Sequence, residues 1–231
     1  MNAENIAYTA SVWVLPILLA ITLHEAAHGW VAWRLGDDTA YRMGRVTFNP
    51  FRHIDPFGTI ILPAMLLLAS GGRVMFGAAK PVPVNFNQLR KPRRDVILVA
   101  AAGPFANLLI GLVSAAGLQG LSLLSGDFRQ WVAVNLVNMI WLNCLLCIFN
   151  LIPLPPLDGG RIAVGLLPGR LARGLASLER SGIFIILGVI LVLPWLGREL
   201  GVDLNVFHWL IGMPAQFLMG LMGQLVGIDL G

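Results

Sequence analysis

Long apolar runs separated by short polar loops dominate the hydrophobic pattern of this sequence. Five of the runs approach or exceed the roughly 20 residues that a helix needs to cross the hydrocarbon core of a bilayer. They lie at about residues 6–35, 96–125, 131–152, 181–196 and 205–228. The pattern therefore predicts an all-α polytopic membrane protein.

A sixth apolar stretch, residues 57–70, is shorter and contains Pro63. Basic residues flank it on both sides, and a spanning helix would place one of these groups outside the cell. A re-entrant hairpin returns to the side that it left, which is tolerated at membrane depth where protein covers the backbone. We therefore expect about five to six transmembrane helices with a short re-entrant or β-containing segment on the cytoplasmic side.

Composition and charge support a membrane protein. Hydrophobic residues make up 57% of the sequence and charged residues 12%, about half the charged fraction of a typical soluble domain. The net charge of +4 comes from basic residues in loops, which suits membrane orientation better than nucleic-acid binding. With basic loops inside, residues 36–95 and 161–180 are cytoplasmic. We expect a multi-pass protein of the cell (inner or plasma) membrane that contacts the lipid bilayer and binds no nucleic acid.

The sequence His24-Glu25-Ala26-Ala27-His28 lies inside the first predicted span. On a helix of about 3.6 residues per turn, His24 and His28 lie on one face, so both imidazoles can reach one Zn²⁺. Glu25 points to the side, close enough to a water molecule at the metal to act as a base. The arrangement is typical of a zinc hydrolase, and the topology derived from the basic loops places it toward the cytoplasmic side. The alternative is two histidines that pack in a helical core.

A zinc site needs a third protein ligand. The metzincin pattern, which supplies a third histidine, fails at Val31 and Arg34. Asp158 is the best candidate, because it follows three prolines that end a helix and precedes two glycines that relax the backbone. An acidic residue in irregular backbone at membrane depth is costly and usually functional. The alternative is an aspartate in an ordinary cytoplasmic turn.

The two cysteines, Cys144 and Cys147, lie in the third predicted span. Two thiols do not make a zinc site alone, and helical spacing would place them roughly 16–21 Å from Asp158. We expect both cysteines to pack in the core.

These motifs resemble the site-2 protease family of intramembrane zinc metalloproteases (peptidase family M50). The family carries H-E-x-x-H on one transmembrane helix and N-x-x-P-x-P-x-L-D-G on a later one, which here begins at Asn150. The resemblance extends to Ala102-Gly103-Pro104 with Asn107 and to the stretches 48–56 and 76–84. The compact prokaryotic members of the family are the most similar.

The resemblance implies one Zn²⁺ per chain, held by His24, His28 and Asp158. It also implies that Glu25 activates water and that Asn150 polarises the scissile carbonyl or binds its oxyanion. For Asn150 the alternative is a helix-capping or interhelical hydrogen bond. The implied activity is hydrolysis of peptide bonds in or near the transmembrane segments of membrane-protein substrates, in regulated intramembrane proteolysis.

We expect one membrane-embedded metalloprotease domain over residues 1–231, without a PDZ-like or CBS domain. Its catalytic core would cover about residues 6–160 and its C-terminal helices about 181–228. Neither the natural substrate nor the oligomeric state follows from the resemblance.

A transmembrane substrate hides its amides in helical hydrogen bonds and must unwind before it can be cut. The segment Pro81-Val-Pro-Val-Asn85 is a candidate for holding the unwound strand, and an ordinary interfacial loop is the alternative. For Gly103, Pro104 and Asn107, close helix packing is the first interpretation and a supporting role at the site is the second.

Two other classes of protein remain open. One is a different membrane zinc hydrolase, such as a prenyl-protein endopeptidase, which would need a downstream glutamate ligand. Glu179 and Glu199 lack such a context. The other is a non-enzymatic membrane scaffold or transporter with an incidental motif, which the zinc content of the purified protein would distinguish.

Overall fold

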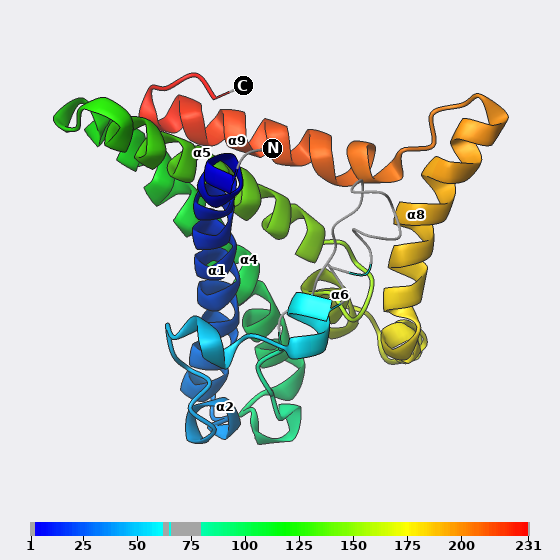
Figure 1. Ribbon diagram of the computed structural model, residues 1–231. Helices are drawn as coiled ribbons and strands as arrows, with labels where there is room; N and C mark the ends of the chain where they lie inside the picture. Colours follow the sequence, from blue (N-terminus) through cyan, green and yellow to red (C-terminus); the bar gives the residue numbers. More distant parts are fainter. Residues whose placement is uncertain (1–2, 62–64, 66–79, 231) are drawn as a thin grey trace.

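The computed structural model describes residues 3–61, 65 and 80–230 (Figure 1). Every regular element in these residues is a helix. Five helices are long and apolar enough to cross a membrane: Ala7–Arg34, Pro92–Leu123, Gly126–Asn150, Gly182–Leu200 and His208–Val226. They coincide with the five long apolar runs, so the prediction of an all-α polytopic membrane protein is confirmed.

The long helices are α1 (Ala3–Arg34), α4 (Pro92–Gln119), α5 (Gly126–Asn150), α8 (Gly182–Leu200) and α9 (Met213–Val226). Shorter helices occupy the connections: α2 (Thr39–Arg42), η1 (Pro50–Arg52), η2 (Pro56–Ile61), η3 (Phe86–Gln88), η4 (Gly120–Leu123), α6 (Asp158–Leu166), α7 (Gly169–Ala176), η5 (Ser177–Arg180) and η6 (His208–Gly212). The predicted re-entrant or β-containing segment lies largely outside the described residues, and its first residues belong to η2.

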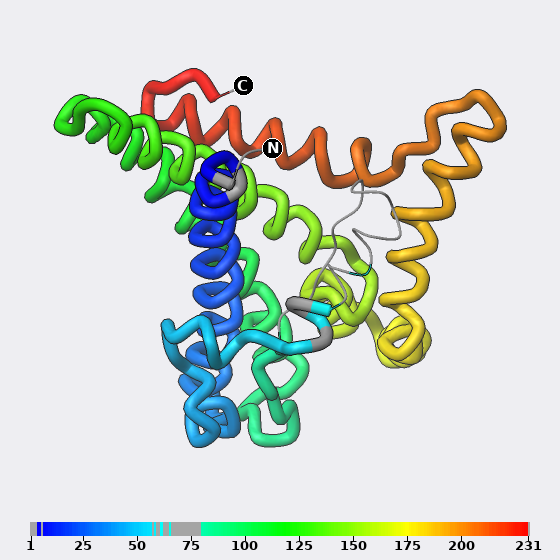
Figure 2. The backbone as a smooth tube through the Cα atoms, viewed as in Figure 1, coloured from blue at the N-terminus to red at the C-terminus, as the bar shows by residue number. Residues whose placement is uncertain are grey.

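Three helices form the centre of the molecule. α1 and α4 pack side by side, and α5 packs against both (Figure 1). α9 lies along α5, whereas α8 stands apart from this group. After α5 the chain turns back to pack α6 against α4 before it continues into α7 and α8 (Figure 2). This return places Asp158, the first residue of α6, beside the histidines of α1.

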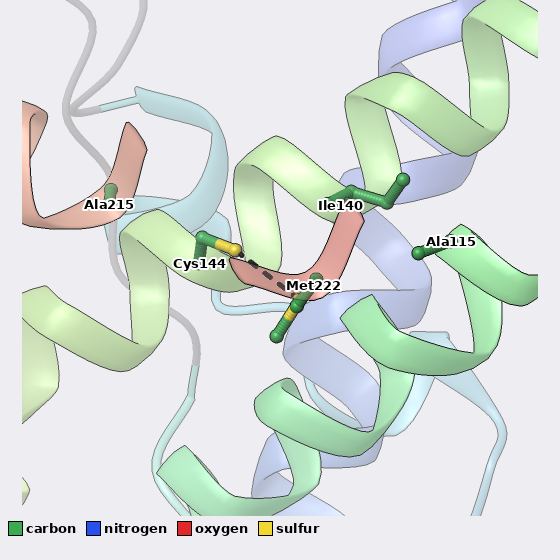
Figure 3. Packing of buried hydrophobic residues seen from close by; sticks show 5 residues of the cluster. All are labelled: Ala115, Ile140, Cys144, Ala215 and Met222. Carbon is green, nitrogen blue, oxygen red and sulfur yellow. Dashed lines mark hydrogen bonds between the residues drawn. The ribbon is translucent and has the colours of Figure 1, made fainter. Parts of the chain in front are cut away.

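Small and apolar side chains fill the contact between α4, α5 and α9. The buried cluster consists of Ala115, Ile140, Cys144, Ala215 and Met222 (Figure 3). The Cys144 thiol donates to the sulfur of Met222 at 3.7 Å, and Cys147 is also buried. The predicted core packing of both cysteines is therefore confirmed.

A proline in α1 is compensated by a neighbouring helix. Pro16 has no N–H, so the carbonyl of Val12 one turn earlier loses its helical hydrogen bond. The side chain of Asn138 on α5 donates to that carbonyl at 2.8 Å. Backbone carbonyls that lack a helical partner inside a membrane need such a donor. The bond also joins α1 to α5 on the N-terminal side of the two histidines.

Candidate metal centre

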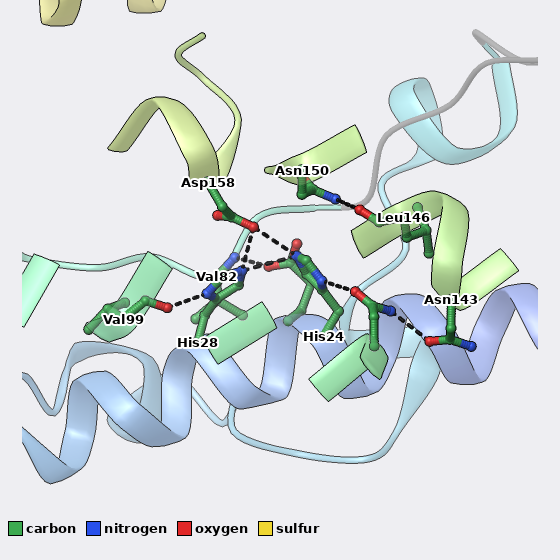
Figure 4. Close-up of polar contacts among 10 residues, drawn as sticks. His24, His28, Val82, Val99, Asn143, Leu146, Asn150 and Asp158 are labelled. Atoms are coloured by element: carbon green, nitrogen blue, oxygen red, sulfur yellow. Dashed lines mark hydrogen bonds and ion pairs between the residues drawn. The ribbon is translucent and has the colours of Figure 1, made fainter. Parts of the chain in front are cut away.

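Two turns of α1 and the first residue of α6 build the candidate metal centre. Nε2 of His24 and Nε2 of His28 lie 3.0 Å apart, and each lies 3.3 Å from Oδ2 of Asp158. Figure 4 shows the three side chains pointing toward one another. All three residues are buried, with 6–8% of their surface exposed. Within the described residues, this is the one group of three His, Cys, Asp or Glu side chains whose ligand atoms converge.

The spacing of these atoms fits a zinc ion. Nitrogen and oxygen ligands lie about 2.0–2.1 Å from zinc, and the corners of a tetrahedron of that size are about 3.3 Å apart. The observed separations of 3.0 and 3.3 Å match this value. Oδ2 of Asp158 is buried and has no hydrogen-bond partner in the described part of the chain. Three converging ligand atoms of this kind fit the donor set that a bound cation would need.

The charge state of Asp158 also suits a metal ligand. Burial raises the pKa of its carboxyl, whereas hydrogen bonds and positive charge from protonated His24 and His28 lower the pKa below its ordinary value. With both histidines neutral, a bound cation would take the place of their protons in keeping the group a carboxylate.

Both histidines are oriented through their second ring nitrogen. Nδ1 of His24 lies 2.5 Å from Oδ1 of Asn107, and Nδ1 of His28 lies 2.7 Å from the carbonyl oxygen of Val99. An amide or carbonyl oxygen only accepts, so each Nδ1 carries the proton and each Nε2 keeps its lone pair for a metal. Of these two partners, Asn107 was predicted to support the site as a second interpretation, and Val99 was not predicted.

Gly103 lets α4 approach the two histidines. A Cβ atom at this position would lie 2.5 Å from Cε1 and 2.6 Å from Nε2 of His24, well inside van der Waals contact. The close approach also places Asn107, one turn later, at hydrogen-bond distance from His24. Both interpretations of Gly103 therefore apply, because the close helix packing is itself what brings α4 to the site.

The irregular backbone between α5 and α6 positions Asp158. Asn150 ends α5, and the chain reaches α6 after a series of turns. Gly159 and Gly160 pack directly on the backbone of Leu151 and Pro155, where a Cβ atom would have no room. The two glycines thus allow the start of α6 to fold back onto this loop and direct the Asp158 carboxylate at α1.

Glu25 lies beside the metal-ligating face and contacts the segment that was predicted to hold substrate. Its Oε2 accepts a hydrogen bond from the backbone N–H of Val82 at 2.8 Å. The flanking backbone is anchored elsewhere: Arg45 donates to the carbonyl of Lys80 at 2.7 Å, and Asp37 accepts from the N–H of Asn85 at 2.6 Å. Residues 80–85 run without regular secondary structure here, so no strand is formed by this segment alone.

Asn150 is the last residue of α5, and its side chain makes a hydrogen bond within its own helix. Its Nδ2 donates to the carbonyl oxygen of Leu146, one turn earlier, at 3.0 Å (Figure 4). The side chain is half-buried. An amide nitrogen carries two protons, so a second donor remains for another acceptor. The predicted role of Asn150 at an oxyanion stays a prediction.

Asn143 on α5 also belongs to the polar network of the site. Its Oδ1 accepts from Nδ2 of Asn107 at 2.7 Å, and its own Nδ2 donates to the carbonyl oxygen of Met139 at 2.8 Å. Both asparagines are 0% exposed. Asn143 was not predicted as a site residue, and its signal in the sequence is an amide side chain inside an apolar span.

Comparisons with known proteins identify the family of the chain. The sequence model of "Peptidase family M50" matches residues 12–133 and 120–194, most of the chain. No solved structure matches the chain.

Curated relatives cover most of the chain and most of their own length. "Putative zinc metalloprotease YwhC" of Bacillus subtilis is 40% identical over 189 residues, which cover 78% of this chain and 80% of the relative. "Putative zinc metalloprotease Rip2" of Mycobacterium tuberculosis is 31% identical over 92% of this chain and 78% of its own length. Rip2 of Mycolicibacterium smegmatis is 29% identical over 90% of this chain and 76% of its own length. As the site-2 protease motifs predict, the chain belongs to peptidase family M50.

Proposed function

We propose that this M50 peptidase is a zinc metalloprotease that hydrolyses peptide bonds in or near the transmembrane segments of membrane proteins. His24, His28 and Asp158 hold one zinc ion per chain, and the observation that carries this assignment is the convergence of Nε2, Nε2 and Oδ2 within 3.3 Å. The family and the five spans favour this function over an unrelated membrane zinc hydrolase and over a scaffold or transporter.

The side chains at the metal centre have separate roles in hydrolysis. Zinc bound by these ligands would polarise the scissile carbonyl and lower the pKa of a water molecule to about 7. Glu25 takes the proton of the attacking water at Oε1, since Oε2 is engaged by the Val82 N–H. As the water oxygen bonds to the carbonyl carbon and the C–N bond breaks, Glu25 returns the proton to the leaving amide nitrogen.

Asn150 and the segment from Pro81 to Asn85 act on the substrate. The second N–H of the Asn150 amide donates to the oxyanion, while the first remains on the Leu146 carbonyl. The Val82 N–H holds Glu25, which places the backbone of this segment directly beside the base. An unwound substrate strand bound along residues 81–85 would therefore bring its carbonyls to the catalytic side of α1.

The protease works in the cell membrane with its site toward the cytoplasmic side. Basic residues concentrate in residues 36–95 and 161–180, which the positive-inside tendency assigns to the cytoplasm. His28 lies six residues before the end of α1 at Arg34, on the side of these loops. One membrane-embedded domain over residues 1–231 carries the activity.

Mapping of new N-termini tests this function. Membranes from cells that express the wild type or Glu25→Gln are compared by terminal proteomics, with zinc content measured on both purified proteins. We expect Glu25→Gln to keep its zinc and to lose cleavage by about 10²–10⁴-fold, because the base is removed while the ligands remain. The new termini should map to the cytoplasmic half of transmembrane segments. Identical termini in both samples would refute the role of Glu25, and cuts confined to the outer third would refute the proposed side.

A further inference from the structure

A chain of buried amides connects His24 to the backbone of α5. Nδ1 of His24 lies 2.5 Å from Oδ1 of Asn107. Nδ2 of Asn107 donates a hydrogen bond to Oδ1 of Asn143 at 2.7 Å. Nδ2 of Asn143 in turn donates to the carbonyl oxygen of Met139 at 2.8 Å. Both asparagines are 0% exposed, so water does not compete for these bonds. The chain crosses from α1 through α4 to α5.

The direction of every bond follows from its last member. The Met139 carbonyl only accepts, so the amide of Asn143 must turn its NH₂ toward it and its oxygen toward Asn107. Asn107 then turns its NH₂ toward Asn143 and its oxygen toward His24. The oxygen of Asn107 only accepts, so the proton of the neutral His24 imidazole resides on Nδ1.

His28 shows why His24 needs this chain. Nδ1 of His28 donates to the carbonyl of Val99, a backbone group that cannot exchange its oxygen for a donor. The amide of Asn107 can present either end to His24. If it presented NH₂, Nδ1 would accept, the proton would move to Nε2, and Nε2 could no longer bind a metal.

We propose that Asn143 is a positioning residue that fixes the orientation of Asn107 and thereby holds His24 as the tautomer able to bind zinc. This inference rests on the proposed role of His24 as a zinc ligand. Asn143 contacts neither the ion nor the substrate; it acts through Asn107 alone.

A second asparagine on the same helix provides a matched control. Asn135 is also buried on α5, and its Nδ2 donates to the carbonyl of Trp131 one turn earlier at 2.9 Å, as Asn143 does with Met139. No hydrogen bond links it to His24: its Oδ1 has no partner in the described residues. Replacing either asparagine removes the same intrahelical bond, and only one replacement interrupts the connection to the metal centre.

The test measures zinc affinity of the detergent-purified protein by competition with a chelator of known affinity. We expect Asn143→Leu to weaken zinc binding by about 10–100-fold, the range for loss of a ligand's orienting partner, and Asn135→Leu to change it by less than about twofold. Asn143→Ala repeats the experiment without a branched side chain in the core. Nitrogen-15 NMR of the zinc-free protein reports the tautomer of His24, with the proton on Nδ1 in the wild type and a population on Nε2 in Asn143→Leu.

A rescue variant separates positioning from packing. The carboxylate in Asn107→Asp has only acceptors, so it holds the Nδ1–H of His24 without help from residue 143. The double variant Asn107→Asp/Asn143→Leu should therefore recover zinc affinity to within a few-fold of the wild type. Wild-type affinity in Asn143→Leu, or a double variant as weak as Asn143→Leu at matched thermal stability, would overturn the proposal. Unchanged zinc affinity in His24→Ala would instead refute the zinc-site assignment itself.

Discussion

The region from α1 to α6 contains buried polar side chains, whereas the C-terminal helices α8 and α9 do not. All of the buried polar and charged residues in the described chain lie between Thr22 and Asp158, on α1, α4, α5, α6 and the loops between them. α8 and α9, both fully described, contain none. Packing differs between the two C-terminal helices: α9 packs against α5 and contributes Ala215 and Met222 to the core, whereas much of α8 is exposed.

The difference separates the region that carries the candidate metal centre from two helices whose buried residues are apolar or glycine. A buried polar group in a membrane is costly unless it has a partner. In the α1–α4–α5–α6 region several of these groups have partners: Asn107 contacts both His24 and Asn143, and His28 contacts the carbonyl of Val99. In α8, large apolar side chains such as Phe184 and Trp195 are exposed, as lipid contact allows.

A pair of glycine substitutions should give the largest contrast between the two regions. Gly103→Ala places a methyl group within 2.6 Å of the histidine rings, so we expect loss of zinc binding by more than about 100-fold together with activity. Gly188→Ala, in the middle of α8, meets nothing within 4 Å and should leave both unchanged. Zinc content and cleavage are measured on the two purified variants. Equal zinc retention would show that zinc binding does not depend on the close approach of α4 to the histidines.

Truncation of apolar side chains should give the next largest contrast. Ile140 is 0% exposed at the contact of α4, α5 and α9, whereas Val192 on α8 is 53% exposed. We expect Ile140→Ala to lower the free energy of unfolding by about 2–5 kcal/mol, because the cavity forfeits packing contacts. Val192→Ala should cost less than about 0.5 kcal/mol. Unfolding in mixed micelles measures both, and similar losses would mean that α8 is packed as tightly as the core.

Removal of the bond that compensates Pro16 should have the smallest effect. Asn138→Leu leaves the Val12 carbonyl without its donor and should cost about 0.6–1.5 kcal/mol of unfolding free energy. Adding Pro16→Ala restores a helical N–H at that carbonyl, so the double variant should regain most of the loss. A double variant no more stable than Asn138→Leu would show that the Asn138 bond does not compensate for the N–H that Pro16 lacks.

The helices were predictable because their signal is local. An apolar run of bilayer length identifies a span from composition alone, and all five predicted spans are present. The positions of His24 and His28 followed from helical spacing, which needs no tertiary information. Asp158 was identifiable because an acidic residue after three prolines is conspicuous in so apolar a sequence.

The partners of these residues were less predictable because they depend on how the helices pack. Val99 contributes a backbone carbonyl, which every residue has, so its side chain carries no signal. Asn143 is one of several asparagines on α5, and only the packing of α4 against α5 distinguishes it from Asn135. The contact between Glu25 and Val82 joins residues 57 positions apart, and no periodic pattern encodes it.

The zinc content of Asp158→Ala tests the central claim most directly, because Asp158 joins the second motif to the first at the metal. Purified Asp158→Ala is compared with the wild type and with Asp127→Ala, an exposed carboxylate at the start of α5. We predict that Asp158→Ala loses most of its zinc while its helices stay folded, since two protein ligands hold the ion poorly. Asp127→Ala should keep one zinc per chain. If Asp158→Ala also keeps one zinc per chain as tightly as the wild type, the third ligand lies elsewhere and the proposed site is wrong.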